Sequence, residues 1–290
     1  MPSRRSLMLA GAGTIAAGVL RGQQNAAPLT AGQVVERIQK NVGVPWRSET
    51  VDTFKAGGPD TRVAGIATTM MATLDVLKRA AAAGRNFVIS HEPTFYSHED
   101  NTSELGGDPT YEFKAEFIRK NGMAIWRFHD HWHAHRPDGI ATGMAEELEW
   151  TKNVDSRNPR LFSFENMTLA GLAKQMQSKL KVRAMRVVGD PGLRVRTVAA
   201  NWGYANQMGG IRSLARPEVD VLVVGEAREW EVVEYADDTV AAGKQKALIV
   251  LGHIVSEQAG MKYCARWLKG FVSEVPVEFV AAAEPFWSPG

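Results

Sequence analysis

The segment Asp220–Glu257, DVLVVGEAREWEVVEYADDTVAAGKQKALIVLGHIVSE, holds the pattern from which the fold class is inferred. Its two apolar runs, DVLVVG and KALIVLG, are typical of strands buried in a sheet. The stretch between them has helical spacing and ends at Gly243, a common residue just after a helix. Strand, helix and strand in this order predict a β-α-β unit and therefore an α/β fold.

The same alternation of strands and helices runs along the chain from Leu29 onward. In the first half, expected strands are RVAGIATT (62–69), NFVIS (86–90) and AIWRF (124–128). A polar interval, TKNVDSRNPR (151–160), separates them from a second series that ends with VPVEFVAA (275–282). We therefore expect two α/β lobes, at residues 28–150 and 151–290, that complete one site.

Composition narrows the classes of function. The 290 residues are 44% hydrophobic and carry 34 basic against 32 acidic side chains, a net charge of +2. The chain therefore lacks the strong positive charge that nucleic-acid binding requires, and no nucleic-acid partner is expected. We expect a small-molecule substrate instead. Cys264 is the only cysteine, and we expect it to be buried. A metal would therefore be held by nitrogen and oxygen ligands.

Residues 1–27, MPSRRSLMLAGAGTIAAGVLRGQQNAA, have a basic start, an apolar glycine-rich stretch and small residues at Ala26 and Ala27. This is the pattern of an export signal. The pair Arg4 and Arg5 indicates the twin-arginine route, and an ordinary secretory signal or an uncleaved anchor are the alternatives. We expect an exported protein, periplasmic or extracellular, with no stable membrane insertion once the signal is removed.

Titratable residues follow four of the expected strands, widely separated in the sequence. In open α/β sheets, ligands bind beyond the carboxyl ends of the strands, so these positions indicate a shared site. Imidazole and carboxylate are ligands for zinc, manganese or ferrous iron, and a site built from several strand ends can hold more than one ion. The residues are His91 and Glu92, then His129, then Glu226, and finally His253 and Glu257.

The stretch RFHDHWHAHRPDG (127–139) has a histidine at every second position, His129, His131, His133 and His135. At most two of them can easily face one ion, because RPDG predicts a turn and the chain is expected to leave the sheet near His129. His135 is expected outside the ligand set. His98, in YSHEDN, is expected in a surface loop.

Three segments together resemble the Nif-three-like dinuclear-metal-centre hexameric proteins, often described as GTP cyclohydrolase I type 2 homologues. GRNFVISHEPTFY (84–96) is similar to the family's strand and SHHP segment. IWRFHDHWHAHRPDGIATGMAEEL (125–148) falls where the family has HTNLD, and residues 220–257 match its GE and GH..SE motifs. The loosely corresponding glycine-rich stretch NWGYANQMGG (201–210) is expected to form a loop near the site whose backbone approaches a ligand closely, and a plain structural turn is the alternative.

The resemblance implies a ring-shaped hexamer and a site for two divalent transition-metal ions, which are zinc, manganese or iron. Two positions depart from the family pattern: Glu92 stands for the second histidine of SHHP, and His133 for the aspartate of HTNLD. Both residue types still ligate metals, so a remodelled site is expected. The expected ligands are His91, Glu92, His129, His133, His253 and Glu257.

These observations favour an exported metal-dependent hydrolase in which two ions activate a water molecule and Glu226 is the candidate catalytic group that relays the proton. A non-catalytic metal-binding or metal-trafficking protein is the alternative. A likeness of HDHWHAH to the HxHxDH run of metallo-β-lactamase-like hydrolases is weaker, because Asp130 lies between the first two histidines rather than before the last. The substrate, the metal and the cleavage site of the signal are not specified by the sequence.

Overall fold

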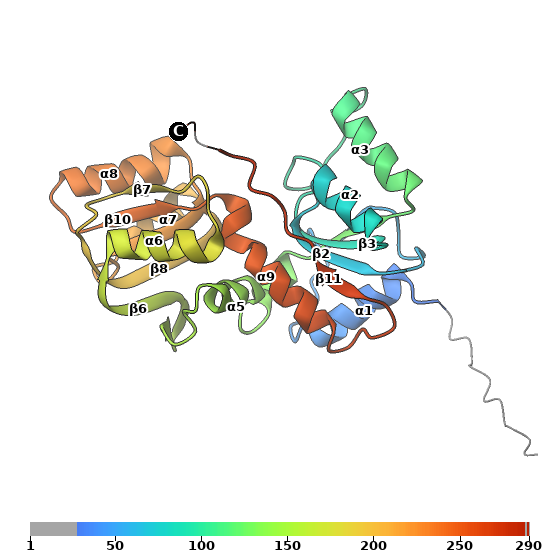
Figure 1. The fold of residues 1–290 in the computed structure, drawn as a ribbon, viewed down its shortest axis with the longest axis horizontal. Helices are drawn as coiled ribbons and strands as arrows, with labels where there is room; N and C mark the ends of the chain where they lie inside the picture. Colours follow the sequence, from blue (N-terminus) through green and yellow to red (C-terminus); the bar gives the residue numbers. More distant parts are fainter. Residues whose placement is uncertain (1–27, 288, 290) are drawn as a thin grey trace, which may run out of the picture.

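A computed structural model of the protein describes residues 28–287 and residue 289 (Figure 1). The expected export signal, residues 1–27, lies outside the described residues and stays a prediction. The described chain forms two β-sheets with helices packed around them. The predicted α/β fold with two lobes is confirmed.

The first sheet has the strand order β1-β4-β3-β2-β11. Its strands are β1 (Phe54–Ala56), β2 (Ile66–Met71), β3 (Phe87–Glu92), β4 (Ala124–Arg127) and β11 (Val277–Phe279). All neighbours are parallel except the β1-β4 pair. The helices of this half are α1 (Ala31–Asn41), α2 (Leu74–Ala82) and α3 (Pro109–Lys120), followed by the short α4 (Asp130–Ala134). Parallel β2, β3 and β4 bring their carboxyl ends to one edge of the sheet.

The second sheet has the order β5-β6-β8-β9-β10-β7. Its strands are β5 (Val154–Asp155), β6 (Asn158–Thr168), β7 (Arg186–Val188), β8 (Arg194–Tyr204), β9 (Val221–Glu226) and β10 (Ala247–Val250). The central strands β8, β9 and β10 are parallel, as the expected β-α-β unit requires. Its helices are α6 (Leu169–Leu180), α7 (Gln207–Leu214) and α8 (Glu234–Ala241), the last preceded by a π-helical turn at Glu229–Val233.

Helix α9 (His253–Leu268) lies between the two sheets and packs against α5 (Gly139–Glu147) and strands β2, β8 and β9 (Figure 1). Two glycines permit the close α5–α9 packing: a Cβ on Gly143 would lie 2.4 Å from Ala259 O, and one on Gly260 would lie 2.5 Å from Ile140 Cα. Cys264 on this helix is fully buried, as expected. The helix therefore fixes the position of its first turn between the two halves.

The C-terminal segment contacts both sheets. Strand β11, counted with residues 151–290 in the sequence, pairs in parallel with β2 of the first sheet. Beyond it, the Glu284 carboxylate accepts the backbone N–H groups of Arg183 and Ala184, next to the second sheet. The two halves are thus joined by α9 and by this segment, and the boundary near residue 150 stays a prediction.

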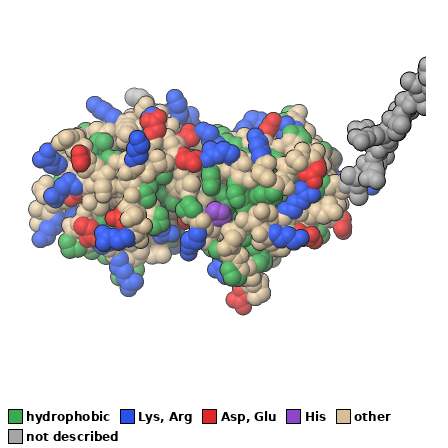
Figure 2. All heavy atoms as spheres, turned by 90° about the horizontal axis from the view of Figure 1, so that it is seen from below, with side chains coloured by type: hydrophobic (Ala, Val, Ile, Leu, Met, Phe, Trp, Pro, Cys, Tyr) green, Lys and Arg blue, Asp and Glu red, His purple; other side chains and the backbone are tan. Residues whose placement is uncertain are grey.

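The face shown in Figure 2 has basic and acidic side chains interspersed, with hydrophobic side chains between them. A histidine side chain reaches this face near the middle of the molecule. Among the described residues, no helix is both long enough and apolar enough to cross a bilayer.

Candidate metal centre

The structure brings the histidines and carboxylates expected at the strand ends together between the two sheets. His91 and Glu92 end β3, and His129 follows β4 as the residue before α4. Glu226 ends β9, and His253 begins α9 directly after β10. His133 on α4 and Glu257, one turn into α9, lie beside them. The four histidines together with Glu92 and Glu257 are called the His/Glu cluster below, and Glu226 borders this cluster.

The four imidazoles of the cluster share one arrangement. In each ring, Nδ1 faces an oxygen outside the cluster and Nε2 faces the cluster carboxylates. The Nδ1 contacts are His91 to Phe128 O at 3.0 Å, His129 to Asp130 Oδ1 at 2.9 Å, His133 to Asp138 Oδ2 at 3.1 Å, and His253 to Glu226 Oε1 at 3.3 Å. In a neutral ring, an acceptor at Nδ1 places the proton there, so Nε2 is the nitrogen left to bind a metal, as in histidines that ligate metals.

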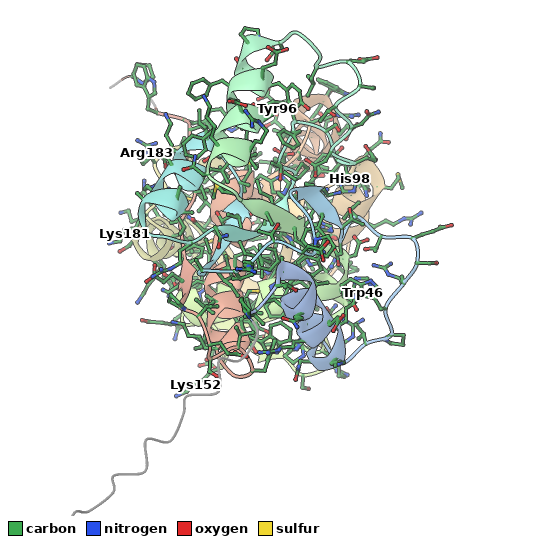
Figure 3. All side chains as sticks on the ribbon, turned by 90° about the vertical axis from the view of Figure 1, so that its right-hand side faces the viewer. Trp46, Tyr96, His98, Lys152, Lys181 and Arg183 are labelled. Carbon is green, nitrogen blue, oxygen red and sulfur yellow. The ribbon has the colours of Figure 1, made fainter. Side chains whose placement is uncertain are left out.

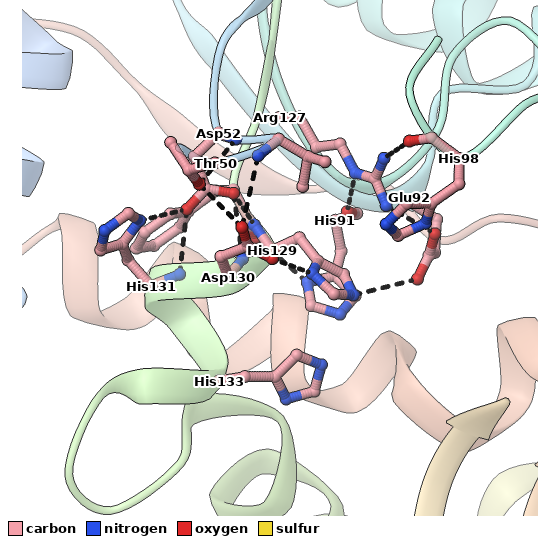
Figure 4. Close-up of polar contacts among 12 residues, drawn as sticks. Thr50, Asp52, His91, Glu92, His98, Arg127, His129, Asp130, His131 and His133 are labelled. Atoms are coloured by element: carbon pink, nitrogen blue, oxygen red, sulfur yellow. Dashed lines mark hydrogen bonds and ion pairs between the residues drawn. The ribbon is translucent and has the colours of Figure 1, made fainter. Parts of the chain in front are cut away.

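Glu92 contacts two of these rings, and Figure 4 shows its contact with His129. Its Oε1 is 3.5 Å from His129 Nε2 and 3.5 Å from His253 Nε2. Its Oε2 accepts a hydrogen bond from Arg127 Nη2 at 3.0 Å. Burial raises the pKa of the Glu92 carboxyl, but His253, His129 and Arg127 outweigh burial and hold that pKa below its ordinary value. Glu92 is therefore ionised, and its orientation is fixed by these contacts.

Glu257 contacts the other side of the cluster. Its Oε2 is 3.2 Å from His253 Nε2 and 3.7 Å from His91 Nε2, and its Oε1 is 3.8 Å from His133 Nε2. The side chains of His91 and Glu257 are only 0% and 3% exposed, and His91 Nε2 and Glu257 Oε2 lack a hydrogen-bond partner among the described residues. Unpaired buried polar atoms are costly, and a shared cation would satisfy both.

Two overlapping groups of ligand atoms follow from this geometry. In each group the three atoms lie within 4.8 Å of one another, and the groups are His91, His129 and His133, and His91, Glu92 and Glu257. His91 belongs to both. This buried His/Glu cluster could hold a metal ion.

The protonation of His253 agrees with such a site. Burial lowers its pKa, but contacts with Glu226, Glu257 and Glu92 outweigh burial and raise the pKa to about 12. The imidazolium is then the cation that neutralises these carboxylates, and a divalent cation would replace its proton. His91, by contrast, is neutral because burial lowers its pKa well below the ordinary value. The residues present therefore fit a divalent metal.

Two residues that the sequence did not indicate hold the side chains of the cluster in place. Arg127 is fully buried, and besides Glu92 it donates hydrogen bonds to His91 O and His98 O. Asp52 is 4% exposed, and its Oδ1 accepts the backbone N–H groups of His129 and Asp130 at 2.7 and 3.0 Å (Figure 4). Asp52 thus satisfies the N–H groups at the start of the segment 129–134, which carries His129 and His133 of the cluster.

The other histidines of the HDHWHAH stretch lie outside the cluster. His131 is buried, and both ring nitrogens are used: Nδ1 bonds Asp52 Oδ2 at 2.7 Å, and Nε2 accepts the Arg47 N–H at 3.0 Å. His131 also stacks on Trp46 with ring centroids 3.6 Å apart. His135 Nδ1 contacts Pro137 O. Only His129 and His133 of the four face the cluster, as the turn in RPDG suggested.

Gly203, in the stretch NWGYANQMGG, brings the backbone against the cluster. The structure places this glycine in strand β8 rather than in a loop, with a left-handed φ of 77°. A Cβ at Gly203 would lie 2.5 Å from Glu257 Oε1 and 3.2 Å from His253 Nε2. The backbone thus approaches the site closely, as expected, and the groups that it approaches are the side chains of Glu257 and His253.

A cavity of about 920 Å³ opens onto the cluster. Glu92, His129, His133, His253 and Glu257 line it together with Glu226, whose side chain is 55% exposed. Other lining residues include Thr94, Tyr96, His98 and Lys114 from the first half, and Trp202 and Tyr204 from the second. The cavity is large enough for a small organic molecule to reach the cluster.

Comparisons with known proteins agree with this fold. The family model Duf34/NIF3 (NGG1p interacting factor 3) matches residues 30–285. The hypothetical protein SA1388 of Staphylococcus aureus is 18% identical with a TM-score of 0.70, over 91% of this chain and 100% of its own. A Bacillus cereus protein related to NIF3 is 16% identical with a TM-score of 0.67, over 91% and 100%. Reduced HcgD from Methanocaldococcus jannaschii is 15% identical with a TM-score of 0.61, over 88% and 98%. No curated protein matches the sequence.

Proposed function

From the finding that the chain belongs to the Duf34/NIF3 family, and from the geometry of the His/Glu cluster, we propose that it binds two divalent transition-metal ions and hydrolyses a small molecule. The metals are zinc, manganese or iron. The proposed ligands are His91, Glu92, His129, His133, His253 and Glu257. Export by the twin-arginine route and assembly into a homo-hexamer are parts of the same proposal.

The observation that carries the proposal is the common orientation of the four imidazoles. Each Nδ1 contacts an oxygen outside the cluster, and each Nε2 lies within 3.8 Å of a carboxylate oxygen of Glu92 or Glu257. Four rings held in this way, around two carboxylates, supply six ligands. Since two groups share His91, the set is large enough for two ions.

The two departures from the family pattern support a remodelled site. Glu92 and His133 replace a histidine and an aspartate, and both side chains face the cluster. Asp138 Oδ2 contacts Nδ1 of His133, the nitrogen that faces away from Glu257, as an oxygen does at Nδ1 of the other three imidazoles. The number of ligands and the sum of their charges are therefore unchanged.

Bound metal ions would supply a water of lowered pKa and polarise the bond under attack. The chain itself supplies a proton acceptor in Glu226, whose carboxylate lines the cavity. Its contact with His253 lowers the pKa of Glu226 below the ordinary value, so the carboxylate is ionised and able to accept a proton. Glu92 and Glu257, buried beneath it, hold the imidazoles in place.

Elemental analysis of the purified protein tests the metal site. We expect about two equivalents of one transition metal per chain in the wild type, as the two overlapping ligand groups imply. The double variant His91→Ala with His253→Ala should lose both. His135→Ala is the matched control, because this ring lies outside the cluster, and it should retain them. Trace metal in well-folded, reconstituted wild type would contradict the proposal.

Hydrolysis is tested with the metal-loaded protein on p-nitrophenyl phosphate, bis(p-nitrophenyl) phosphate and p-nitrophenyl acetate. Turnover that is lost in Glu226→Gln, with the metal content unchanged, would support the enzyme. Full metal loading with no turnover of any ester would favour the metal-binding or metal-trafficking protein. Light scattering of the same sample tests the hexamer.

A further inference from the structure

Lys114 on α3 is a buried cation in the wall of the metal-site cavity. Its residue exposure is 4%, and it lines the cavity together with the loop after β3. Its Nζ donates to Thr94 O at 2.5 Å and lies 5.6 and 5.3 Å from the ring centroids of Phe95 and Tyr96. Among the described residues, no carboxylate oxygen lies within 4.0 Å of Nζ. A buried ammonium without an ion pair is costly to the fold.

The carboxylate whose charge acts on Lys114, that of Asp100, is engaged elsewhere. Asp100 Oδ1 accepts the backbone N–H groups of Thr94 and Phe95, both at 2.6 Å, and Oδ2 lies 3.7 Å from Lys55 Nζ. Asp100 therefore holds the loop and neutralises Lys55. Although burial lowers the pKa of Lys114 to about 8, most molecules carry its charge at pH 7.

Thr94 supplies a second group beside Lys114. The residue is 2% exposed, it lines the same cavity, and its Oγ1 has no hydrogen-bond partner among the described residues. A hydroxyl and an ammonium in the wall of one cavity can both donate hydrogen bonds to an anionic oxygen. Tyr96 lies beside α3 at this end of the cavity (Figure 3) and has a left-handed φ of 70°. This conformation is unfavourable for an aromatic residue, and such strain is typical of functional loops.

We propose that Thr94 and Lys114 form a subsite for an anionic group of the substrate, a carboxylate or a phosphate ester, whose reactive bond lies at the His/Glu cluster. This inference rests on the proposed function for the position of the reactive bond. The cavity then has one acidic end that takes cations and one basic end that takes anions. The proposed substrate is a small organic acid or phosphate ester rather than a neutral molecule.

Calorimetric titration of the zinc-loaded protein with inorganic phosphate, and separately with acetate, tests the subsite. Lys114→Met should raise the dissociation constant of the preferred anion at least about tenfold, since one charge-assisted hydrogen bond is lost. Thr94→Val should raise it about threefold. Lys120→Met removes an exposed lysine of the same helix and should bind as the wild type does. Tighter binding of phosphate would identify an ester, and tighter binding of acetate a carboxylic acid.

Equal dissociation constants for wild type and Lys114→Met would overturn the subsite, because any phosphate bound would then lie on the metals alone. If neither phosphate nor acetate binds the wild type, the subsite is overturned too. The zinc content of each sample is measured as well. A wild type that holds zinc but binds no anion at Lys114 contradicts the subsite alone, whereas a wild type without zinc contradicts the proposed metal site. If the wild type takes up no zinc, the same titration of the zinc-free protein still tests Lys114.

Discussion

Asp52 Oδ1 accepts the backbone N–H of His129 at 2.7 Å, although the two residues are 77 positions apart in the sequence. Asp52 Oδ2 also accepts the backbone N–H and the ring Nδ1–H of His131. One buried carboxylate thus replaces the local side-chain cap that α4 lacks. The orientation of the segment that carries His129 and His133 depends on it.

We therefore expect Asp52→Asn to weaken metal binding without touching a ligand. The amide nitrogen cannot accept a hydrogen bond, so the first turn of α4 loses acceptors for its N–H groups. The zinc dissociation constant should rise about 10- to 100-fold, and the free energy of unfolding should fall by about 1–3 kcal/mol. Asp60→Asn, at an exposed position, is the control. Wild-type zinc affinity in Asp52→Asn would show that Asp52 does not position α4.

Arg127 and Glu92 form a buried ion pair whose energetic role should depend on the metal. Arg127→Met removes the hydrogen-bond donor of Glu92 Oε2 and leaves His129 and His253 as the remaining partners of this buried carboxylate, which should cost about 1–3 kcal/mol in the metal-free protein. A cation bound to Glu92 would offset part of this loss, so the destabilisation should be smaller when zinc is bound. Denaturant unfolding with and without zinc measures the difference.

Adding Glu92→Gln to Arg127→Met should restore part of the stability of the metal-free protein, because it removes the negative charge of Glu92 that lost its Arg127 donor. Arg119→Met, which removes an exposed arginine on α3, should change little in either state. The same loss for Arg127→Met with and without zinc would argue against Glu92 as a ligand.

The strand-end pattern predicted much of the cluster because parallel strands carry their following residues to one edge. His91, Glu92 and His129 were found in this way, since each ends or follows an apolar run. Arg127 had a signal that went unused: a charged residue inside the buried strand AIWRF needs a partner. Asp52 had none, because a lone aspartate before a short strand looks like any surface residue.

Features of longer range could not be predicted. The pairing of Val277 in β11 with Ile66 in β2 joins segments from opposite ends of the chain, and an apolar run does not specify its neighbour. The π-helical start of the helix at Glu229–Val233 has the same apolar spacing as an α-helix within one turn. Gly203 was expected near the site from its sequence context, but its strand conformation was not.

Gly203 allows a test of how closely the backbone must approach the ligands. Gly203→Ala should displace Glu257, since the new Cβ would lie 2.5 Å from its Oε1. Gly243→Ala is a matched control, because Gly243 has nearly the same φ, 76° against 77°, with no atom within 4 Å of the added Cβ. Both variants should lose about 1 kcal/mol of stability from the left-handed backbone. Only Gly203→Ala should also lose zinc affinity, by at least about tenfold. Equal zinc affinity in the two variants would mean that the cluster tolerates the displacement.

Lys114→Met should make the protein more stable at pH 7, the opposite of most substitutions of buried residues. The pKa of Lys114 is about 8 in the folded protein against 10.5 for an ordinary lysine, because burial outweighs the attraction of Asp100. The unfolded chain therefore binds the proton more tightly, and the wild type gains stability as the pH rises from about 8 to 10.5. Below pH 8 the full free-energy cost of burying the charged Lys114 is present, up to about 3 kcal/mol.

Lys55, the other lysine near Asp100, is present in both proteins and cancels in the comparison. Denaturant unfolding at pH 7 and pH 10 should show the advantage of Lys114→Met at pH 7 and its fall to below about 1 kcal/mol at pH 10. An equal difference in the free energy of unfolding at the two pH values would show that the buried charge of Lys114 does not destabilise the fold. If the difference does follow pH, the chain keeps at this position a charge that weakens its own fold, as a group retained for binding an anion would.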